Sequence, residues 1–419
     1  MFMMCPSLKS FNVDMPKLKT CQYMFTYCLA LESFNSDLSS LEDGSKLLGG
    51  CKNLKSFNAD LSSLTTAERM LAGTKLSSFN IPVDNLTSAY AMFLGCDALT
   101  SFDSDLSNLT DGRFMFSGCS SLSSFNSDLP NLTDGWRMFE DCSSLTSFDS
   151  DLSNLTSGTD MFNGCNSFTS FDSDLPKLTR GSGMFDGCSS LASFDSNLST
   201  VTYGSYMFSG CSSLTSFNSD LSNLTNGSHM FQNCTSLPSF NSDLSKLTNG
   251  YEMFLGCDAL TSFNSNLSNV TYGAKMFQYC SSLASFDSDL NSLDDGSYMF
   301  QYCTSLASFD SDLSKLTDGF YMFKACSSLT SFNSDLNSLT NGNYMFNGCK
   351  LDKTSVLNII NCIKTKNTCS SAVTLTLGID ASLQSDSDIL TELGISSGAT
   401  SATLSGNGGG TWNITIQWN

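Results

Sequence analysis

The chain has 419 residues, of which 14% are charged, and 40 acidic against 20 basic side chains give a formal net charge of −20. The negative charge lies mainly in residues 92–349, whereas the charges of residues 1–91 sum to zero. Such a field repels phosphate, which argues against nucleic acid or an anionic membrane as a partner. No run of 18 apolar residues is present, so no membrane-inserted helix is predicted.

Residues 1–349 repeat a unit with the consensus M-F-x-G-C-x-S-L-x-S-F-[N/D]-S-D-L-x-x-L-T-x-G-x-x. A fixed period of about 23 residues is typical of a solenoid. The units in residues 1–91 are the least regular, and Thr74 once replaces the cysteine. We therefore predict a repeat solenoid of about 15–16 coils, β-rich, whose apolar slots form buried columns between neighbouring coils.

Within one unit, four apolar slots have helical spacing and predict a short α or 3₁₀ turn: Met92, Phe93, Cys96 and Leu99. The alternation over Phe102–Asp105 predicts a short strand that exposes Asp103 and Asp105. Gly112, which recurs in later units as far as Gly342, is predicted to adopt a positive φ at a turn.

The first residues of the chain are already in repeat phase, and no signal peptide is visible. We therefore expect an uncapped first coil, attached to an upstream domain or exported by a non-standard route. A virion component would need no signal at all.

The tail, residues 350–419, breaks the repeat phase and is predicted to form a small α+β cap. Asp352–Thr365 reads as an amphipathic helix that covers the last coil, and residues 373–377 alternate as a strand. A short helix over Ser385–Leu393 ends at Gly394, and a final strand follows from Trp412 to Trp418.

The pattern M-F-x-G-C-x-x-L-x-S-F over residues 1–349 resembles the A-F-x-x-C-x-x-L-x-x-I repeat of BspA-like (Treponema-type) leucine-rich repeat proteins. It departs from that repeat by Phe for Ile at the strand and by S-D-L where the family has I-P-x-x-V. The resemblance implies a right-handed solenoid with a parallel sheet, and a role at a cell surface in adhesion or receptor binding. The tail is similar to the piece that follows such repeats in some gut bacterial and phage proteins.

Two columns are open to a chemical interpretation. The cysteines lack C-x-x-C pairs and are interpreted as small buried thiols, although Cys362 and Cys369, outside the column, could form a disulfide. The acidic columns could bind calcium, or their side chains could bond to backbone N–H groups at turns. The calcium candidates are Asp103, Asp105, Asp149, Asp151, Asp172, Asp174, Asp287, Asp289, Asp310 and Asp312. No other cofactor is predicted.

Variation among the units concentrates between the Thr of the L-T pair and the residue before Cys, and aromatic residues gather there. Exposed aromatic rings suit both sugars and proteins, although they could also stack on one another. The candidate ligand-binding residues are Trp136, Tyr203, Tyr206, Tyr251, Tyr272, Tyr298, Phe320, Tyr321 and Tyr344.

Catalysis has little support. The only histidine, His229, lies five residues before Cys234, but a Cys–His pair needs an exposed thiol and Cys234 belongs to the core column. The leading hypothesis is a non-enzymatic binding or adhesion protein on a cell or virion surface, extracellular, that recognises a host or bacterial glycan or protein. The alternative is a structural spacer or assembly subunit that docks through its first coil. Its partner could be a second copy of the chain, which would make it a homo-oligomer.

Overall fold

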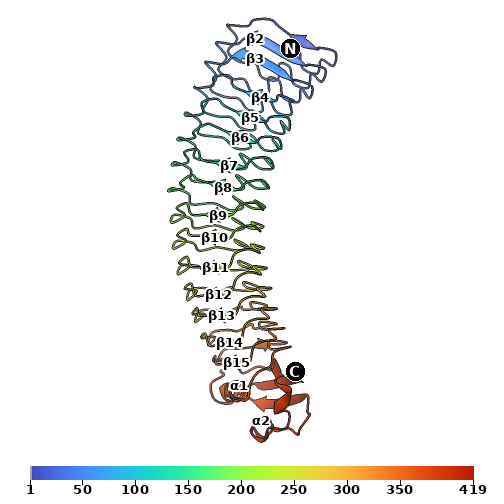
Figure 1. The fold of residues 1–419 in the computed structure, drawn as a ribbon, viewed down its shortest axis with the longest axis vertical. Helices are drawn as coiled ribbons and strands as arrows, with labels where there is room; N and C mark the ends of the chain where they lie inside the picture. The colour runs from blue at the N-terminus through green and yellow to red at the C-terminus, as the bar shows by residue number, and fades with distance from the viewer. Residues whose placement is uncertain (1) are drawn as a thin grey trace. The chain divides into compact units, whose positions relative to one another are not determined.

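The computed structural model describes residues 2–419, and the chain divides into two compact units, Met1–Cys211 and Ser212–Asn419. Both are parts of a parallel β-solenoid with coils of about 23 residues, which confirms the predicted fold class. Fifteen short strands, each starting at a Ser-Phe pair, enclose about 14 complete coils (Figure 1). The tail, residues 350–419, belongs to the second unit. The predicted change from coils to tail at 349/350 therefore lies inside that unit, and a domain boundary there stays a prediction.

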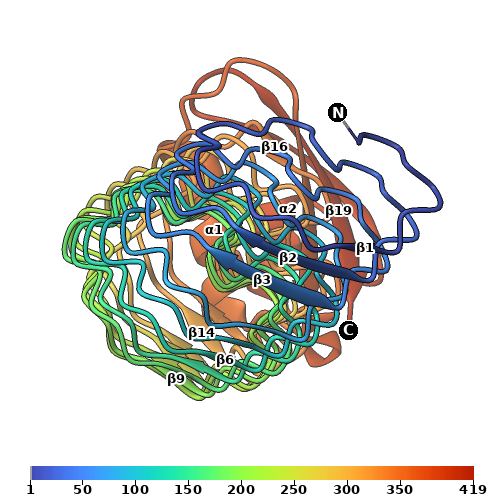
Figure 2. The same ribbon diagram turned by 90° about the horizontal axis from the view of Figure 1, so that it is seen from above.

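The strands of the first unit are β1 (Ser10–Phe11), β2 (Ser33–Asp37), β3 (Ser56–Asp60), β4 (Ser78–Phe79), β5 (Ser101–Phe102), β6 (Ser124–Phe125), β7 (Ser147–Phe148), β8 (Ser170–Phe171) and β9 (Ser193–Phe194). Those of the second are β10 (Ser216–Phe217), β11 (Ser239–Phe240), β12 (Ser262–Phe263), β13 (Ser285–Phe286), β14 (Ser308–Phe309), β15 (Ser331–Phe332) and β16 (Asn341–Gly342). The strands pair in parallel within short sheets, including β1-β2-β3, β4-β5-β6, β7-β8, β11-β12-β13 and β14-β15. Ser lies opposite Ser and Phe opposite Phe, as in β1-β2-β3, which lie side by side in Figure 2.

A second ladder of single parallel bridges joins the coils at the residue before the Gly slot. Asp111 bridges to Asp134 and Asp134 to Ser157 in the first unit, and Tyr272 bridges to Asp295 in the second. We call these positions the bridge column. Where a strand pairing and a bridge are both present, a coil is fixed to its neighbour at two places, and a slip by one residue would turn the buried side chains outward.

The core consists of the predicted apolar columns. In the coil that starts at Met92, seven side chains are buried to 1% exposure or less: Met92, Phe93, Cys96, Leu99, Phe102, Leu106 and Leu109. Two phenylalanine columns interleave, since Phe93 stacks on Phe116 at 5.4 Å while Phe116 packs edge-on against Phe102 at 4.9 Å. Burial between coils, which a single unit could not achieve, therefore stabilises the array.

The predicted α or 3₁₀ turn takes the form of single hydrogen-bonded turns of the 3₁₀ type, and no continuous helix forms in the described coils. The N–H groups of Met92 and Cys96 bond back to carbonyls three residues earlier. The N–H groups of the alternate residues Ala91, Phe93 and Gly95 donate to carbonyls of the next coil at 2.7–2.9 Å. A helix would need every N–H to point the same way, so the bonds between coils override the helical spacing of the sequence.

The prediction of a positive φ at the glycine slot is wrong. Gly112 and its equivalents do not have positive φ. A Cβ on Gly112 would lie 2.9 Å from Met138 Sδ of the next coil, so glycine makes room for the methionine column. Ala67 and Ala89 occupy this slot early in the chain, which shows that the flexible methionine can yield to a methyl group.

The tail contains α1 (Lys353–Thr365), β17 (Val373–Ile379), the 3₁₀ helix η1 (Ala381–Leu383), α2 (Ser387–Leu393), β18 (Ser401–Ser405) and β19 (Thr411–Trp418). Both predicted helices and both predicted strands are present, whereas β18 was not predicted. Asp352 caps α1 by accepting from Ser355 N at 2.8 Å, and Gly394 ends α2 at φ 67°.

The tail continues the last coil directly. The sheet order β16-β17-β19-β18 joins the coil strand β16 to the tail. Phe332 N of β15 donates to Ser355 Oγ of α1 at 2.8 Å, and Leu336 N donates to Cys362 Sγ at 3.2 Å. The helix therefore covers the last coil, as expected from its apolar face.

Candidate binding surface

The residue directly before the Met slot, which we call the pre-methionine column, has a left-handed backbone in every coil. All fifteen of its members have φ between 48° and 62°. Fourteen of them are not glycine: Tyr23, Lys46, Arg69, Ala91, Phe114, Arg137, Asp160, Tyr206, His229, Glu252, Lys275, Tyr298, Tyr321 and Tyr344. The left-handed region costs a non-glycine residue roughly 1–2 kcal/mol, so the chain repeatedly retains side chains where glycine would be less strained.

The residue before Cys is a second left-handed position, which we call the pre-cysteine column, and it behaves differently. Nine of its sixteen members are glycine, as the backbone conformation favours. Its exceptions include Tyr279 and Tyr302, which stack on each other at 5.0 Å. The contrast singles out the pre-methionine column as the position where side chains are kept despite strain.

The structure places the nine aromatic candidates in three neighbouring columns of the variable segment. Tyr203 and Tyr272 belong to the bridge column. Trp136, Tyr251 and Phe320 follow the Gly slot directly, in what we call the post-glycine column, and the other four belong to the pre-methionine column: Tyr206, Tyr298, Tyr321 and Tyr344. Five of the nine are more than one-third exposed, namely Trp136, Tyr203, Tyr206, Tyr272 and Tyr344.

In the second unit the rings form a stack, which we call the tyrosine ladder. Tyr298 stacks on Tyr321 at 5.1 Å, and Tyr321 stacks on Tyr344 at 4.8 Å. Phe320 packs edge-on against Tyr321, and the ammonium group of Lys324 lies 4.4 Å from the Tyr321 ring centroid. Tyr344 is exposed and Tyr298 and Tyr321 are half-buried, so the ladder offers partly accessible rings held by stacking.

A polar cluster adjoins Tyr251 in the same unit. Glu252 is 8% exposed and accepts from Lys275 Nζ at 2.8 Å, while His229 Nδ1 lies 3.1 Å from Glu252 Oε2. Burial alone would raise the pKa of Glu252, but hydrogen bonds from Lys275 and Tyr251 outweigh it and lower that pKa. Tyr251 stacks on Tyr272 at 5.5 Å. His229 thus belongs to a polar network with Gln232 and Glu252, whereas Cys234 is buried in the core.

In the first unit the variable segment combines arginine with aromatic rings. Tyr90, Phe114 and Trp136 form a chain of contacts with ring centroids 5.7 and 4.8 Å apart. The guanidinium of Arg113 lies 5.6 Å from the Tyr90 ring centroid, and that of Arg137 lies 5.6 Å from the Trp136 ring centroid. Tyrosine, tryptophan and arginine are the side chains that dominate protein interfaces.

The acidic column that contains Asp105 and Asp151 forms hydrogen bonds to the backbone. Asp105 Oδ1 accepts from Ser107 N at 2.7 Å, and Asp151 Oδ1 accepts from Ser153 N at 2.8 Å. Asn197 makes the same bond to Ser199 N, so the charge is not needed. Within residues 2–419 no group of three or more His, Cys, Asp and Glu side chains is placed to hold a metal ion. The calcium site stays a prediction.

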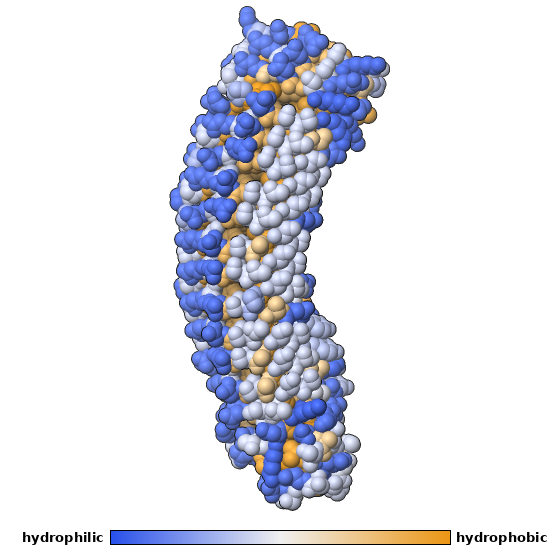
Figure 3. Space-filling model, viewed as in Figure 1, coloured by the Kyte–Doolittle hydropathy of each residue, from blue (hydrophilic) through white to orange (hydrophobic). Residues whose placement is uncertain are grey.

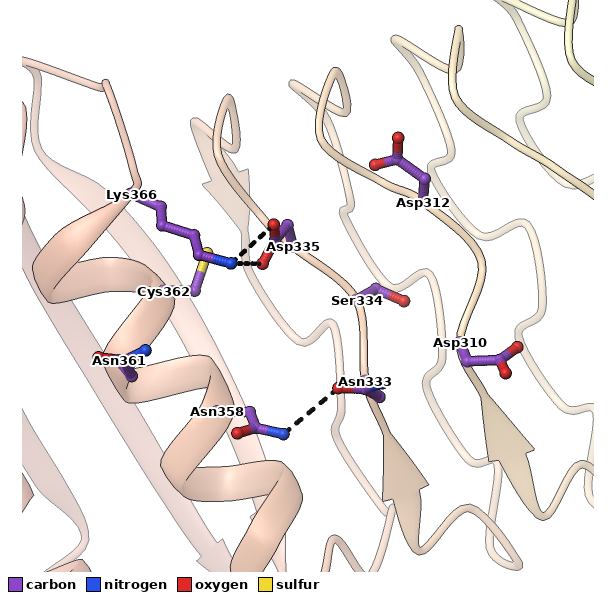
Figure 4. Close-up of a pocket in the computed structure, with 9 residues that line it drawn as sticks. All are labelled: Asp310, Asp312, Asn333, Ser334, Asp335, Asn358, Asn361, Cys362 and Lys366. Atoms are coloured by element: carbon purple, nitrogen blue, oxygen red, sulfur yellow. Dashed lines mark hydrogen bonds and ion pairs between the residues drawn. The ribbon is translucent and has the colours of Figure 1, made fainter.

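Two calcium candidates, Asp310 and Asp312, line a polar pocket of about 320 Å³ against α1 (Figure 4). Lys366 forms an ion pair with Asp335 at 2.7 Å there, and Asn358 contacts Asn333 at 3.4 Å. The pocket is lined by Asp310, Asp312, Asn333, Ser334, Asp335, Asn358, Asn361, Cys362 and Lys366. It closes the end of both acidic columns and contains one lysine against three carboxylates.

The cysteine column has a role beyond filling space. Cys119 Sγ donates to the carbonyl of Phe93 in the preceding coil at 3.2 Å, and Cys165 Sγ donates to Phe139 O at 3.1 Å. Burial raises the pKa of the Cys119 thiol well above its usual range, so the thiolate is strongly disfavoured. The thiols are therefore structural hydrogen-bond donors and poor nucleophiles.

The proposed disulfide between Cys362 and Cys369 is not formed, since both are free cysteines. Cys362 is buried against the last coil, where its sulfur accepts from Leu336 N at 3.2 Å. Cys369 is half-buried and faces the carbonyl of Ser371. The Cys362 sulfur points from α1 toward the last coil, where it satisfies the Leu336 N–H.

Two features of the surface escaped the sequence analysis. The left-handed backbone of the pre-methionine column has no glycine signal in the sequence. The concentration of all four arginines of the chain in the variable segments of residues 69–180 was visible in the sequence and not used. In Figure 3, the viewed face of each unit has a strongly hydrophilic edge beside a broad surface of near-neutral hydropathy.

A family model described as the BspA type leucine-rich repeat region matches the chain in six copies, over residues 1–100, 89–179, 135–261, 176–284 and 248–372. No curated protein matches the sequence. Within residues 2–419 no helix is both long and apolar enough to span a bilayer.

Solved structures with a similar fold include a leucine-rich repeat protein from Bacteroides ovatus, at 21% identity over 89% of this chain and 80% of that chain, with a TM-score of 0.43. A leucine-rich cell surface protein from Faecalibacterium prausnitzii is 20% identical over 67% of this chain and 83% of its own, with a TM-score of 0.35. A leucine-rich repeat protein from Eubacterium ventriosum is 14% identical over 78% and 79%, with a TM-score of 0.35.

Proposed function

Because the chain belongs to the BspA-type leucine-rich repeat family, we propose that it is a non-enzymatic binding protein that recognises a glycan or a protein receptor through its variable segments. Repeat proteins of this kind mediate protein binding or surface interaction. The proposal places the protein outside the cell, on a cell or virion surface.

The observation that supports this proposal is the pre-methionine column. Fourteen side chains are held there in a backbone conformation that glycine would adopt without strain. Strain that recurs at one surface position is a reason to infer a function for the side chains located there. The neighbouring pre-cysteine column, with nine glycines, shows what the same backbone conformation selects without that requirement.

The tyrosine ladder has the chemistry for such recognition. Its rings are supported by stacking, so little side-chain entropy is lost when a ligand covers them. Each tyrosine adds a hydroxyl group that can donate and accept hydrogen bonds. Because stacking covers the ring faces inside the ladder, the accessible parts of the rings and their hydroxyl groups are the surface that would contact a sugar or a protein.

The test is a glycan array together with a panel of candidate surface proteins, probed with the wild-type protein and with Tyr298→Ala/Tyr321→Ala. Ligands of the ladder should be lost in the double variant. Tyr27→Ala is the matched control, because Tyr27 has the same left-handed backbone and is 50% exposed but lies outside the candidate surface. Equal binding by all three proteins to every ligand would exclude the ladder as the site.

The structural alternative is supported by apolar side chains exposed in the first coil, where Met4 is 61% and Val13 58% exposed. If this coil is a docking surface, removal of residues 1–23 should change the oligomeric state measured by light scattering. An unchanged oligomeric state, together with loss of ligand in the double variant, favours the binding function.

A further inference from the structure

A notch in the first unit spans three successive coils at the bridge and post-glycine columns. Asp134, Ser157 and Arg180 are consecutive members of the bridge column, joined by parallel bridges. The middle coil contributes the small Ser157 and Thr159, whereas its neighbours contribute Trp136 and Arg180. The resulting pocket has a volume of about 290 Å³ and is lined by Thr133, Asp134, Trp136, Thr156, Ser157, Thr159 and Arg180.

Arg180 is exceptional among the four arginines. Arg113 and Arg137 form ion pairs with carboxylates at 2.8 and 3.2 Å, and Arg69 lies over the Tyr90 ring. Within residues 2–419, Arg180 has no carboxylate partner within 4 Å and no aromatic ring beneath its guanidinium. A planar guanidinium without a partner at the rim of a pocket is suited to bind a carboxylate through two hydrogen bonds.

The opposite rim is aromatic and rigid. Trp136 is 37% exposed, and its ring is supported by Phe114 at 4.8 Å and by the Arg137 guanidinium at 5.6 Å. Trp136 and Arg180 belong to coils two repeats apart, which places their backbones about 10 Å from each other. One sugar ring with its substituents fits such a span.

The floor and one corner are polar. The hydroxyl groups of Ser157 and Thr159 have no partner in the protein among residues 2–419. The Asp134 carboxylate, on the same rim as Trp136, can accept from sugar hydroxyl groups and would repel a carboxylate. An acidic sugar is therefore oriented with its carboxylate over Arg180 and its hydroxyl groups toward Asp134.

We propose that this notch binds a sugar residue bearing a single carboxylate, such as a uronic acid, within a surface glycan. The inference rests on the proposed binding function and names the ligand class for one of its sites. The net charge of the chain supports a ligand with one anionic group, because the field of the repeats repels polyanions while one local guanidinium acts at short range. An acidic peptide is the competing ligand.

The experiment compares two probes that differ only at one carbon, methyl glucuronide and methyl glucoside, by saturation-transfer NMR and titration calorimetry on the full chain. The wild-type protein should bind the glucuronide at least about tenfold more tightly, as expected for a charge-assisted pair. Arg180→Gln should remove that difference, and Trp136→Ala should weaken binding of both sugars. Arg69→Gln, which removes the same charge from a residue that contacts Tyr90 and does not line the notch, should leave the preference unchanged.

Equal affinity of wild type for the two sugars, or a preference that survives Arg180→Gln, would overturn the inference. So would binding of a glutamate-containing tripeptide in place of the glucuronide, which would assign the notch to a protein carboxylate. Unchanged thermal unfolding of each variant establishes that the fold is intact. Absence of the glucuronide preference in the wild type, with intact ladder-dependent binding on the array, would refute this inference and leave the proposed function standing.

Discussion

Replacing Cys165 by alanine should lower the free energy of unfolding by about 1.3 kcal/mol. The side chain is fully buried, so removing its sulfur forfeits about 0.8 kcal/mol, the value for one methylene-sized group. The change also removes the hydrogen bond from Cys165 Sγ to Phe139 O at 3.1 Å, worth about 0.5–1.5 kcal/mol. The lower end applies, because Phe139 O keeps its second donor, Cys142 N.

Cys165→Thr separates the two contributions. Thr74 shows that a threonine fits this column, although its Oγ1 contacts Cys96 Sγ of the next coil at 3.4 Å and not a carbonyl of the preceding one. In Cys165→Thr the hydroxyl can donate to Phe139 O in place of the thiol. We expect Cys165→Thr to lose less than half the stability that Cys165→Ala loses. Cys165→Ser, which restores the donor without the volume, should fall between them.

The measurement is urea unfolding followed by tryptophan fluorescence. Trp136 is the only tryptophan of the first unit, so it reports on the coils near Cys165. Only midpoints obtained with an unchanged urea dependence are comparable. A threonine variant less stable than the alanine variant would refute the hydrogen-bond account, and a neutral alanine variant would refute both contributions.

Burial raises the pKa of Cys51 to about 12 from its usual 9.0, so between these values the unfolded chain releases a proton that the folded chain keeps. The stability from each such thiol is complete below pH 9 and falls by about 1.4 kcal/mol per pH unit above it. Thermal unfolding from pH 7 to 11 should show this decline, and a flat profile would contradict it. Only Cys5 and Cys369 are half-buried, so a thiol reagent should label these two rapidly and the other sixteen at the rate of unfolding; fast labelling of more would show the column to be open. Asp151→Ala should cost about 0.5–1.5 kcal/mol by removing the acceptor for Ser153 N, whereas Asp151→Asn should be close to neutral in the same urea assay. A melting temperature that drops on chelation of calcium would show instead that the acidic columns bind the cation.

The repeat made the architecture predictable. The cysteine, phenylalanine and leucine slots could be identified as columns, because only burial between coils could offset the entropy of ordering each unit. The tail helix was visible from its apolar face. β18 escaped because Ser401–Ser405 has only two apolar residues, Ala402 and Leu404, although it pairs with β19 in an antiparallel hairpin closed by residues 406–410.

Two differences within the coils, the single turns in place of a continuous helix and the glycine slot without a positive φ, have one physical cause. Contacts between coils do not appear in the sequence of one unit. The slots of Met92, Phe93 and Cys96 match a helix, but the N–H of Phe93 bonds to Met115 O of the next coil. Gly112 was assigned to a turn, whereas the side chain that requires a glycine there, Met138, belongs to the following coil.

The variable segment could be located from the sequence, whereas its backbone geometry could not, and its role as a binding surface stays a prediction. Variation among the units pointed to the segment that contains Trp136 and Tyr321, and both lie there. The left-handed backbone could not be read from tyrosine or arginine, which do not favour it. The pairing of Trp136 with Arg180 becomes visible only after the columns are aligned, since the two belong to different slots of coils two repeats apart.

The double ladder has a genetic consequence. Paired coils bond through their Ser-Phe strands and their bridge residues, with equivalent positions of the repeat opposite each other. Within one unit, recombination between two near-identical repeats that removes one whole coil would rejoin both ladders without a gap. The core would be unchanged, while the order of side chains along the surface would be new. Lineages could thus exchange whole coils and alter what the protein recognises while the fold is preserved.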